Sequence, residues 1–150
     1  MENLEITRMT AEDLEGVFEV EKTAFPLPWP ISSFEEELRN ILATYLIAKQ
    51  GNKVVGYIGL WFIMDECHIT NVAVHSDYRK QKIATRLVER MLELCKEHFT
   101  TYVTLEVRKN NIPAQCLYKK FGFKAEAVRK EYYKNPDNTR EDAIIMSLEL

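Results

Sequence analysis

A run of basic residues in the middle of the chain has the composition and position of an anion-binding turn. Val72 and Val74 alternate with small or polar neighbours, which is typical of a half-buried strand. Apolar residues recur at steps of three and four from Ile83, which predicts a helix. Residues 79–82, Arg-Lys-Gln-Lys, lie between the two. A helix that begins here presents free N–H groups and the positive end of its dipole, which suits a phosphate or pyrophosphate; the alternative is a solvated basic helix start.

Two residues further along the chain could move protons. Glu106 lies in an otherwise apolar strand, where alternation places it on one face together with Thr104. It could be a general base, or a glutamate that faces solvent or pairs with an arginine. Tyr118 lies in a helical stretch and could be a general acid, although a packed tyrosine is the commoner case. Neither residue decides the chemistry by itself.

Length, composition and charge restrict the class of protein. The 150 residues predict one domain, residues 1–150, which is long enough to bury a core. A net charge of −3 argues against direct binding of nucleic acid, which requires a basic surface. The first five residues do not have the pattern of a signal peptide, and no apolar run approaches membrane-spanning length. We therefore expect a cytoplasmic protein that does not contact membranes.

The cysteines and histidines do not have the spacing of a metal site. Cys67, Cys95 and Cys116 cannot all pair with one another, and we expect all three to be reduced thiols in the core. No metal is therefore expected. His68 could be a second base, but a histidine in a strand is more often packed. The other two histidines, at positions 75 and 98, are expected at the surface or at helix ends.

The pattern along the chain predicts an α/β (α+β) fold with a mixed, mostly antiparallel central sheet of about seven strands, flanked by about four helices. Strands are expected at residues 4–9, 44–50, 53–63, 67–74, 101–107, 124–133 and 142–148, and the later helices at 83–98 and 111–121. Thr10 with Asp13 predicts the cap of the first helix. Ser32 or Ser33, each three residues before a glutamate, predicts the cap of the second, which ends at Arg39.

The loop between these first two helices carries more apolar surface than a solvated loop requires. It contains three prolines and the side chains of Phe25, Leu27 and Trp29. Prolines at this density end a helix. The loop either packs onto the core or forms a wall that faces a substrate.

Several of these motifs together resemble the GNAT superfamily of acetyl-CoA-dependent N-acetyltransferases. The basic turn is similar to the family's pyrophosphate loop: Arg79 and Ala84 match its pattern, whereas Lys82 stands where the family usually has glycine. The family's C-terminal motif is matched by residues 105–108, 111, 114, 117–118 and 121–123. The expected order of helices and strands is also the family's, so the resemblance covers nearly the whole chain.

A narrower resemblance points to one subfamily. Residues 28–29, 71–74, 132–133 and 141–146 resemble RimI, the bacterial ribosomal-protein-alanine N-acetyltransferases. This resemblance implies that Glu106 is the general base and that Tyr118 is the general acid toward the leaving thiolate. It implies acetyl-CoA binding by Val72, Ala73, Val74, Arg79, Lys80, Gln81, Lys82, Ile83, Ala84, Thr85, Asn111 and Tyr118. Acceptor binding is expected at Trp29, Glu106 and Tyr132.

These motifs lead to a specific functional expectation. We expect an enzyme that acetylates the N-terminal alanine of a small-subunit ribosomal protein by direct transfer in a ternary complex, as a monomer or weak dimer. Direct transfer is favoured because no cysteine falls where the motifs suggest an acetylated intermediate. The alternatives are a related enzyme that acts on lysines or a small amine, and a non-catalytic CoA-binding module. Lys82 is the residue that favours the binding module.

Overall fold

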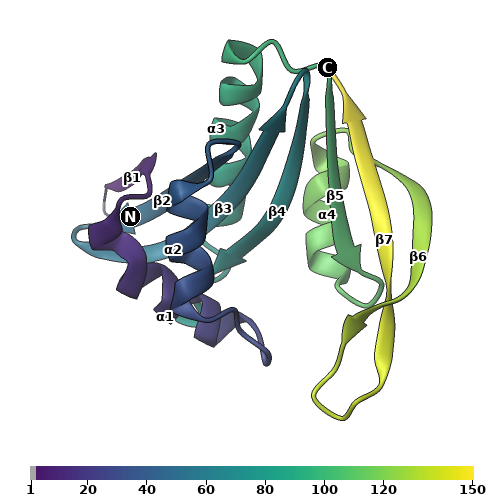
Figure 1. The fold of residues 1–150 in the computed structure, drawn as a ribbon, viewed down its shortest axis with the longest axis horizontal. Coiled ribbons are helices and arrows are strands. Elements are labelled where there is room, and N and C mark those ends of the chain that lie inside the picture. The colour runs from purple at the N-terminus through teal and green to yellow at the C-terminus, as the bar shows by residue number, and fades with distance from the viewer. Residues whose placement is uncertain (1–2) are drawn as a thin grey trace.

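A twisted sheet of seven strands forms the centre of the computed structural model, which describes residues 3–150 (Figure 1). The strand order is β1-β2-β3-β4-β5-β7-β6, and neighbouring strands are antiparallel except for the parallel pair β4 and β5. The strands are β1 (Leu4–Arg8), β2 (Ala43–Gln50), β3 (Lys53–Ile63), β4 (Glu66–Val74), β5 (Tyr102–Arg108), β6 (Lys124–Lys134) and β7 (Arg140–Glu149).

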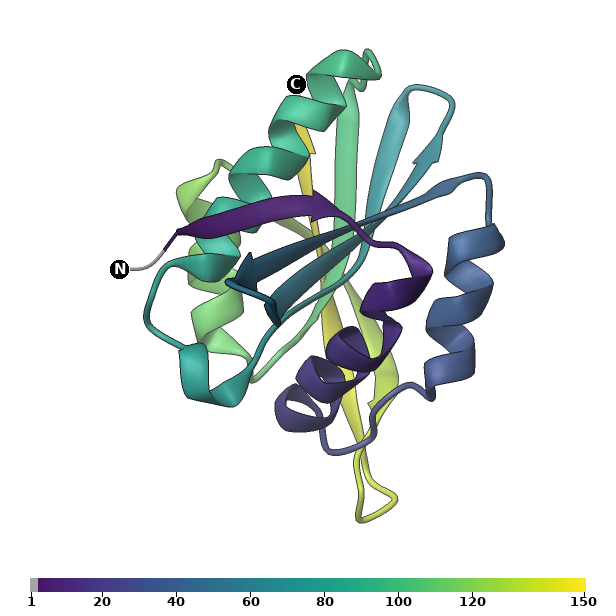
Figure 2. The ribbon, with the colours of Figure 1, turned by 90° about the vertical axis from the view of Figure 1, so that its left-hand side faces the viewer.

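Four α-helices cover the two faces of this sheet. They are α1 (Leu14–Ala24), α2 (Ile31–Arg39), α3 (Ile83–Glu97) and α4 (Ile112–Lys120), and two short 3-10 turns are η1 (Ala11–Asp13) and η2 (Ser76–Tyr78). Figure 2 shows α1 and α2 on one side of the sheet and α3 and α4 on the other. The predicted mixed fold is therefore confirmed.

Each face of the sheet has its own hydrophobic core. The larger core contains the buried stripe of α3, which repeats at steps of three and four as the sequence predicts: Ile83, Leu87, Val88, Met91 and Cys95. The smaller core lies beneath α1 and α2, where Phe34 packs edge-on against Tyr45 and Tyr57. The sheet is thus fixed from both sides around β3 and β4.

The parallel strands β4 and β5 pair over only part of their length. The ladder joins Glu66–Ile69 to Tyr102–Leu105 and stops there, and the two ribbons diverge beyond it (Figure 1). Thr70 is an extra residue in β4, because Gly59 pairs with Asn71 while the next residue of β3 pairs with Ile69. Such a bulge redirects a strand. The backbone of β4 after Ile69 is therefore not paired with β5.

Some local expectations are wrong. The second helix begins at Ile31 with Pro30 at its N-cap, so neither Ser32 nor Ser33 caps it. Pro30 has an extended backbone, with φ −70° and ψ 158°, and the helical conformation begins at the next residue, ahead of both serines. Cys116 is exposed on α4, whereas the other two cysteines are buried as expected. Thr10 and Asp13 do form a capping box, at η1.

The sequence predicts no membrane-spanning segment, and the length and apolar character of the helices bear on this prediction. Within residues 3–150, no helix combines the length and the apolar character needed to cross a membrane. The expectation about the N-terminus partly concerns Met1 and Glu2, which lie outside the described residues.

Candidate active site

A cavity of about 320 Å³ opens where β4 and β5 separate. Its walls come from residues 69–72 of β4, residues 105–108 of β5 and the loop between α1 and α2. Among the residues predicted to act in the site, those that line it are Trp29, Val72, Glu106, Asn111, Tyr118 and Tyr132. The separation of two parallel strands thus brings together residues more than 100 positions apart in the sequence. The loop containing Trp29 packs on the core through Phe25 and also lines the cavity; that it faces a substrate stays a prediction.

Glu106 lies on the side of β5 that the alternation predicts. Val103, Leu105 and Val107 are buried, and Glu106 is on the opposite side with Thr104. His68 lies beside Glu106, with its Nε2 3.2 Å from the Glu106 Oε2. This hydrogen bond lowers the pKa of Glu106 below its usual value, against the opposing effect of burial. The carboxylate is therefore held in its ionised form, which is the form that can accept a proton.

The environment of Tyr118 shifts its pKa in the opposite direction to that of Glu106. It is 6% exposed and packs against Phe123 on α4's side of the cavity. Burial raises the pKa of Tyr118 well above its usual value. The phenol consequently keeps its proton across the physiological pH range, as a proton donor must.

A chain of hydrogen bonds joins Glu21, Tyr57 and Asn71, of which Glu21 and Asn71 line the cavity. Glu21 of α1, which is 2% exposed, accepts the backbone N–H of Trp29 at 2.8 Å and the hydroxyl of Tyr57. Asn71 donates its side-chain N–H to the Tyr57 Oη at 2.7 Å, and its Oδ1 accepts the Thr70 hydroxyl at 2.9 Å. Burial raises the pKa of Glu21. The chain ties the loop of Trp29 to the bulge of β4.

Glu21 was not predicted to be a site residue. A signal was present, because Glu21 lies four residues after the buried Val17 and so falls on the apolar face of its helix. A charged residue on such a face needs a partner in the core.

Close approach of side chains at the bulge requires a glycine in the neighbouring strand. The Tyr45 Oη lies 3.0 Å from the Thr70 Oγ1, across Gly59. A Cβ at Gly59 would lie 2.4 Å from each of these two side chains, closer than atoms can approach. Gly59 therefore leaves the space in which Tyr45 contacts Thr70, the extra residue of the β4 bulge.

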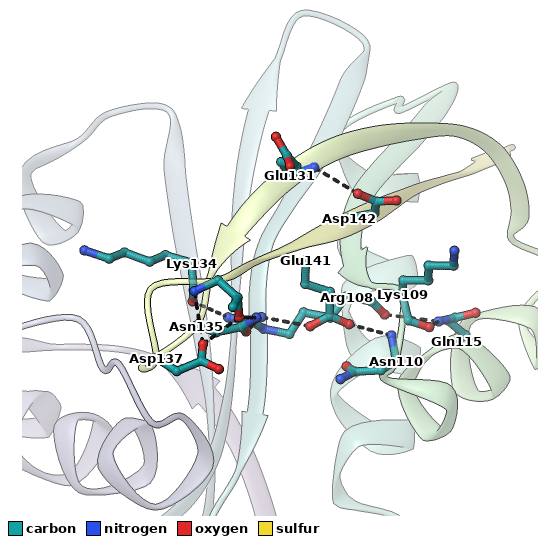
Figure 3. Close-up of polar contacts among 11 residues, drawn as sticks. Arg108, Lys109, Asn110, Gln115, Glu131, Lys134, Asn135, Asp137, Glu141 and Asp142 are labelled. Atoms are coloured by element: carbon teal, nitrogen blue, oxygen red, sulfur yellow. Dashed lines mark hydrogen bonds and ion pairs between the residues drawn. The ribbon is translucent and has the colours of Figure 1, made fainter.

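The third wall is aromatic and comes from β6. Tyr132 and Tyr133 line the cavity, and the Arg108 guanidinium lies 4.5 Å from the centre of the Tyr133 ring. Figure 3 shows Arg108 reaching into the hairpin of β6 and β7, where it contacts Glu141 at 3.0 Å and Asn135 at 2.9 Å. Arg108 is thus engaged within the protein and fixes the position of Tyr133.

A second contact in Figure 3 explains how β6 turns its tyrosines toward the cavity. The ladder between β6 and β7 shifts register between Arg129 and Tyr133, and Glu131 there has a φ of 51°. Asp142 of β7 accepts the Glu131 backbone N–H at 2.9 Å. Glu141, through Arg108, and Asp142 therefore stabilise the part of β6 that contains Tyr132 and Tyr133.

Comparison with known proteins places this geometry in a family. Residues 14–123 match the acetyltransferase (GNAT) family, which is more than half of the chain. The chain belongs to the GNAT family. A Bacillus subtilis protein that carries the provisional name [ribosomal protein bS18]-alanine N-acetyltransferase is 43% identical over 142 residues, which are 94% of this chain and 92% of that protein.

Solved structures agree with this assignment. The crystal structure of the ribosomal-protein-S18-alanine N-acetyltransferase from Escherichia coli superimposes with a TM-score of 0.91 and 28% identity, over 98% of this chain and 94% of that one. Arabidopsis thaliana NAA60 in complex with acetyl-CoA shares the fold, with a TM-score of 0.88 and 16% identity over 99% of each chain. The chain described above is thus a GNAT N-acetyltransferase, and its similarity to the RimI subfamily is confirmed.

The basic turn of this GNAT chain lies at the start of α3, outside the residues that line the cavity. Lys82 is the N-cap of α3 and has a φ of 61°, and Lys80 has a φ of 64°. Left-handed conformations cost an L-amino acid about 1–2 kcal/mol, which accounts for the glycine usual at the position of Lys82. Both lysine side chains are exposed, so the backbone N–H groups at the helix start remain open to a ligand.

Two further residues that were predicted to bind the cofactor have buried side chains. Ile83 and Ala73 are 1% and 5% exposed, so only their backbone groups could meet a ligand. Asn111 caps α4, because its Oδ1 accepts the Ala114 N–H at 3.2 Å, and its side chain also borders the cavity. Among residues 3–150, no group of three metal-ligating side chains is assembled.

Proposed function

We propose that this N-acetyltransferase moves an acetyl group from acetyl-CoA to the α-amino group of an N-terminal alanine on a small-subunit ribosomal protein. The observation that carries the proposal is one cavity that joins an ionised carboxylate, a protonated phenol and the edge of β4 that is not paired with β5. The acceptor is supported by the E. coli and B. subtilis relatives, which are named for alanine acetylation of a ribosomal protein.

Glu106 is proposed as the general base. Only the neutral form of an amine attacks a thioester, so the acceptor's ammonium must lose a proton. An α-amino group has a pKa of about 7.7–8.0, compared with about 10.4 for lysine. A carboxylate that is ionised at neutral pH can take this proton directly or through one water. Because an α-amino group loses its proton more easily than a lysine does, this base favours an α-amine as the acceptor.

Tyr118 and β4 are proposed to stabilise the charge that develops as the thiolate leaves. Tyr118 would donate its phenolic proton to the thiolate sulfur. A backbone N–H among residues 72–74 would donate to the carbonyl oxygen as it gains negative charge. Of the three cysteines, all of which are described, none lines the cavity. The absence of a cysteine from this lining supports direct transfer within a ternary complex.

Acetyl-CoA is proposed to lie along β4 from the cavity to the start of α3. The backbone of Val72, Ala73 and Val74 would pair with its pantetheine arm as an added strand, since β5 leaves this edge open. Residues 79–85 would hold its pyrophosphate at the helix N-terminus, and Asn111 would contact the arm. The site residues present therefore fit this cosubstrate.

The acceptor peptide is proposed to enter between the aromatic walls that contain Trp29 and Tyr132. Residues 1–150 would act as one N-acetyltransferase domain, as a monomer or weak dimer in the cytoplasm. The contact with the ribosomal protein would be made with its N-terminus and not with nucleic acid, in keeping with the net charge of −3.

Acetyl transfer to three kinds of short peptide tests this function. One peptide begins with alanine, one with serine or methionine, and one has a blocked N-terminus and an internal lysine. CoA release and peptide mass are followed together, and an enzyme with Glu106→Gln serves as the control for uncatalysed transfer. We expect modification of the free alanine peptide and none of the blocked peptide.

Other outcomes separate the alternatives. Transfer only to the blocked peptide would identify a lysine acetyltransferase. If no peptide is modified, a calorimetric titration with acetyl-CoA shows whether the chain binds the cosubstrate without turnover. Binding without transfer to any acceptor would support a CoA-binding module.

A further inference from the structure

His68 belongs to a three-residue arrangement at the point where β4 and β5 separate. His68 and Thr104 are direct partners in the parallel ladder, and the pair that follows them is the last. Their side chains lie on the same side of the sheet as Glu106, two residues further along β5. The His68 imidazole therefore lies beside the last residue pairs of the β4–β5 ladder. The Glu106 carboxylate lies just beyond these pairs and lines the cavity.

Both ring nitrogens of His68 are engaged. The Nδ1 lies 2.9 Å from the Thr104 Oγ1, and the Nε2 lies 3.2 Å from the Glu106 Oε2. A carboxylate can only accept a hydrogen bond, so the proton lies on Nε2. The Thr104 hydroxyl can donate to the unprotonated Nδ1, so a neutral imidazole satisfies both contacts.

His68 does not itself line the cavity, whereas Glu106 does. Its side chain is 30% exposed, compared with 17% for Glu106. Any effect of His68 on the acceptor must therefore pass through the carboxylate. A histidine that is held by one partner and orients another through its second nitrogen is a recurring means of fixing a reactive group.

We infer that His68 is a positioning residue whose Nε2–H holds the Glu106 carboxylate turned toward the acceptor amine. The inference rests on the proposed function, because it requires Glu106 to be the base. Thr104 in turn holds the imidazole in the tautomer that this contact needs.

Other groups that act on the pair do not replace this contact. Arg129 of β6 interacts electrostatically with Glu106, and so does Tyr133. The Trp61 ring lies 6.4 Å from the His68 ring and is bound through its Nε1 to Glu37 of α2. Only His68 donates a side-chain hydrogen bond to the carboxylate among the contacts of the described residues.

Substitution of His68 by leucine and by glutamine tests the inference. His68→Leu keeps the bulk and removes the donor, whereas His68→Gln keeps an N–H donor at a similar reach. We expect His68→Leu to lower kcat about 10-fold while the KM for acetyl-CoA changes less than about 2-fold. His68→Gln should recover most of kcat.

The pH profile separates positioning from general structural damage. Loss of the donor removes the largest influence that lowers the pKa of Glu106. The acid limb of kcat should therefore move to higher pH in His68→Leu, and stay close to wild type in His68→Gln. His98→Leu is a matched control, because His98 stacks on Phe62 at the end of α3, away from the cavity. Its kcat and pH profile should equal those of the wild type.

Thr104 provides a second test if His68→Leu fails to fold. Thr104→Val removes the hydroxyl at equal size and should lower kcat in the same direction by a smaller factor, and Thr104→Ser should restore it. A wild-type pH profile and kcat in His68→Leu, or in Thr104→Val where His68→Leu does not fold, would overturn the inference. That result leaves the proposed function intact, whereas absence of peptide transfer by the wild-type chain would overturn the function itself.

Discussion

Two carboxylates line the same cavity, and their pKa values are shifted in opposite directions. Glu21 lies in α1 beneath the loop of Trp29, is almost fully buried and has a raised pKa. Glu106 lies on β5, is partly exposed and has a lowered pKa. Burial dominates at Glu21, despite two hydrogen bonds that oppose it, and the His68 contact dominates at Glu106.

This difference shows how one cavity separates a structural acid from a reactive base. The carboxyl of Glu21 is occupied by Trp29 and Tyr57, so it holds a wall in place. Glu106 has one side-chain donor and borders open space, so it can take up a proton from a ligand. Pairs of titratable groups whose environments move their pKa values apart are typical of acid–base sites.

The largest expected effect separates the two carboxylates by activity. Glu106→Gln should lower kcat about 100-fold or more, because the amide cannot accept the acceptor's proton. Glu21→Gln, which keeps an oxygen for the Trp29 N–H and places its NH2 group beside the Tyr57 hydroxyl, should retain most of the turnover. Steady-state kinetics measure both variants, and calorimetry should give unchanged acetyl-CoA affinity for Glu106→Gln. Equal losses in the two variants would remove the functional distinction.

Tyr118→Phe should have the next largest effect on turnover. The substitution removes the proton donor and keeps the packing against Phe123. A thiol has a pKa of about 8.5, so a thiolate leaves without strong need of a proton, and we expect a loss near the lower end of acid catalysis, about 100-fold. Single-turnover rates with the alanine peptide measure it. A wild-type rate would exclude Tyr118 from the chemistry.

Local periodicity was sufficient to predict most of the fold. The alternation in β5 and the three-and-four spacing in α3 depend on neighbours in sequence, and both were confirmed. The predicted cap of α2 was wrong because the helix begins at Ile31, directly after Pro30, so both serines that fit the usual capping pattern lie inside the helix. The exposure of Cys116 depends on how α4 docks, which no local pattern encodes.

The candidate site was less predictable, because its key contacts join distant segments. The contact of His68 with Glu106 requires the register of β4 against β5, which is set by tertiary packing. The burial of Glu21 requires Tyr57, which is 36 residues away. The positive φ of Lys82 is invisible in a lysine, although glycine in related sequences hints at it. The sequence motifs identified some of the residues that line the cavity, but not Glu21, which also lines it, nor the contact of His68 with Glu106.

Stability should distinguish what each side of the cavity contributes to folding. Glu21→Leu removes the acceptor for the Trp29 N–H and the Tyr57 hydroxyl and leaves both without it. Each buried unsatisfied group costs about 1–3 kcal/mol of unfolding free energy. Urea unfolding should show this loss, and Glu21→Gln should lose less. A Glu21→Leu protein as stable as the wild type would show that the wall does not depend on this carboxyl.

The smallest effect is the pH dependence of stability, and its sign differs between the two carboxylates. A raised pKa in the folded state means that Glu21 stabilises the protein most below its unfolded value of about 4.3 and loses this contribution as pH rises through the folded pKa. The lowered pKa of Glu106 gives a contribution that is present above the unfolded value and is lost as pH falls through the folded pKa. The unfolding free energy of the wild type relative to Glu21→Gln should therefore decline from pH 4 to pH 7, whereas relative to Glu106→Gln it should increase. Parallel slopes in the two difference curves, measured by urea unfolding across this range, would contradict the assignment of one carboxylate to the wall and the other to the chemistry.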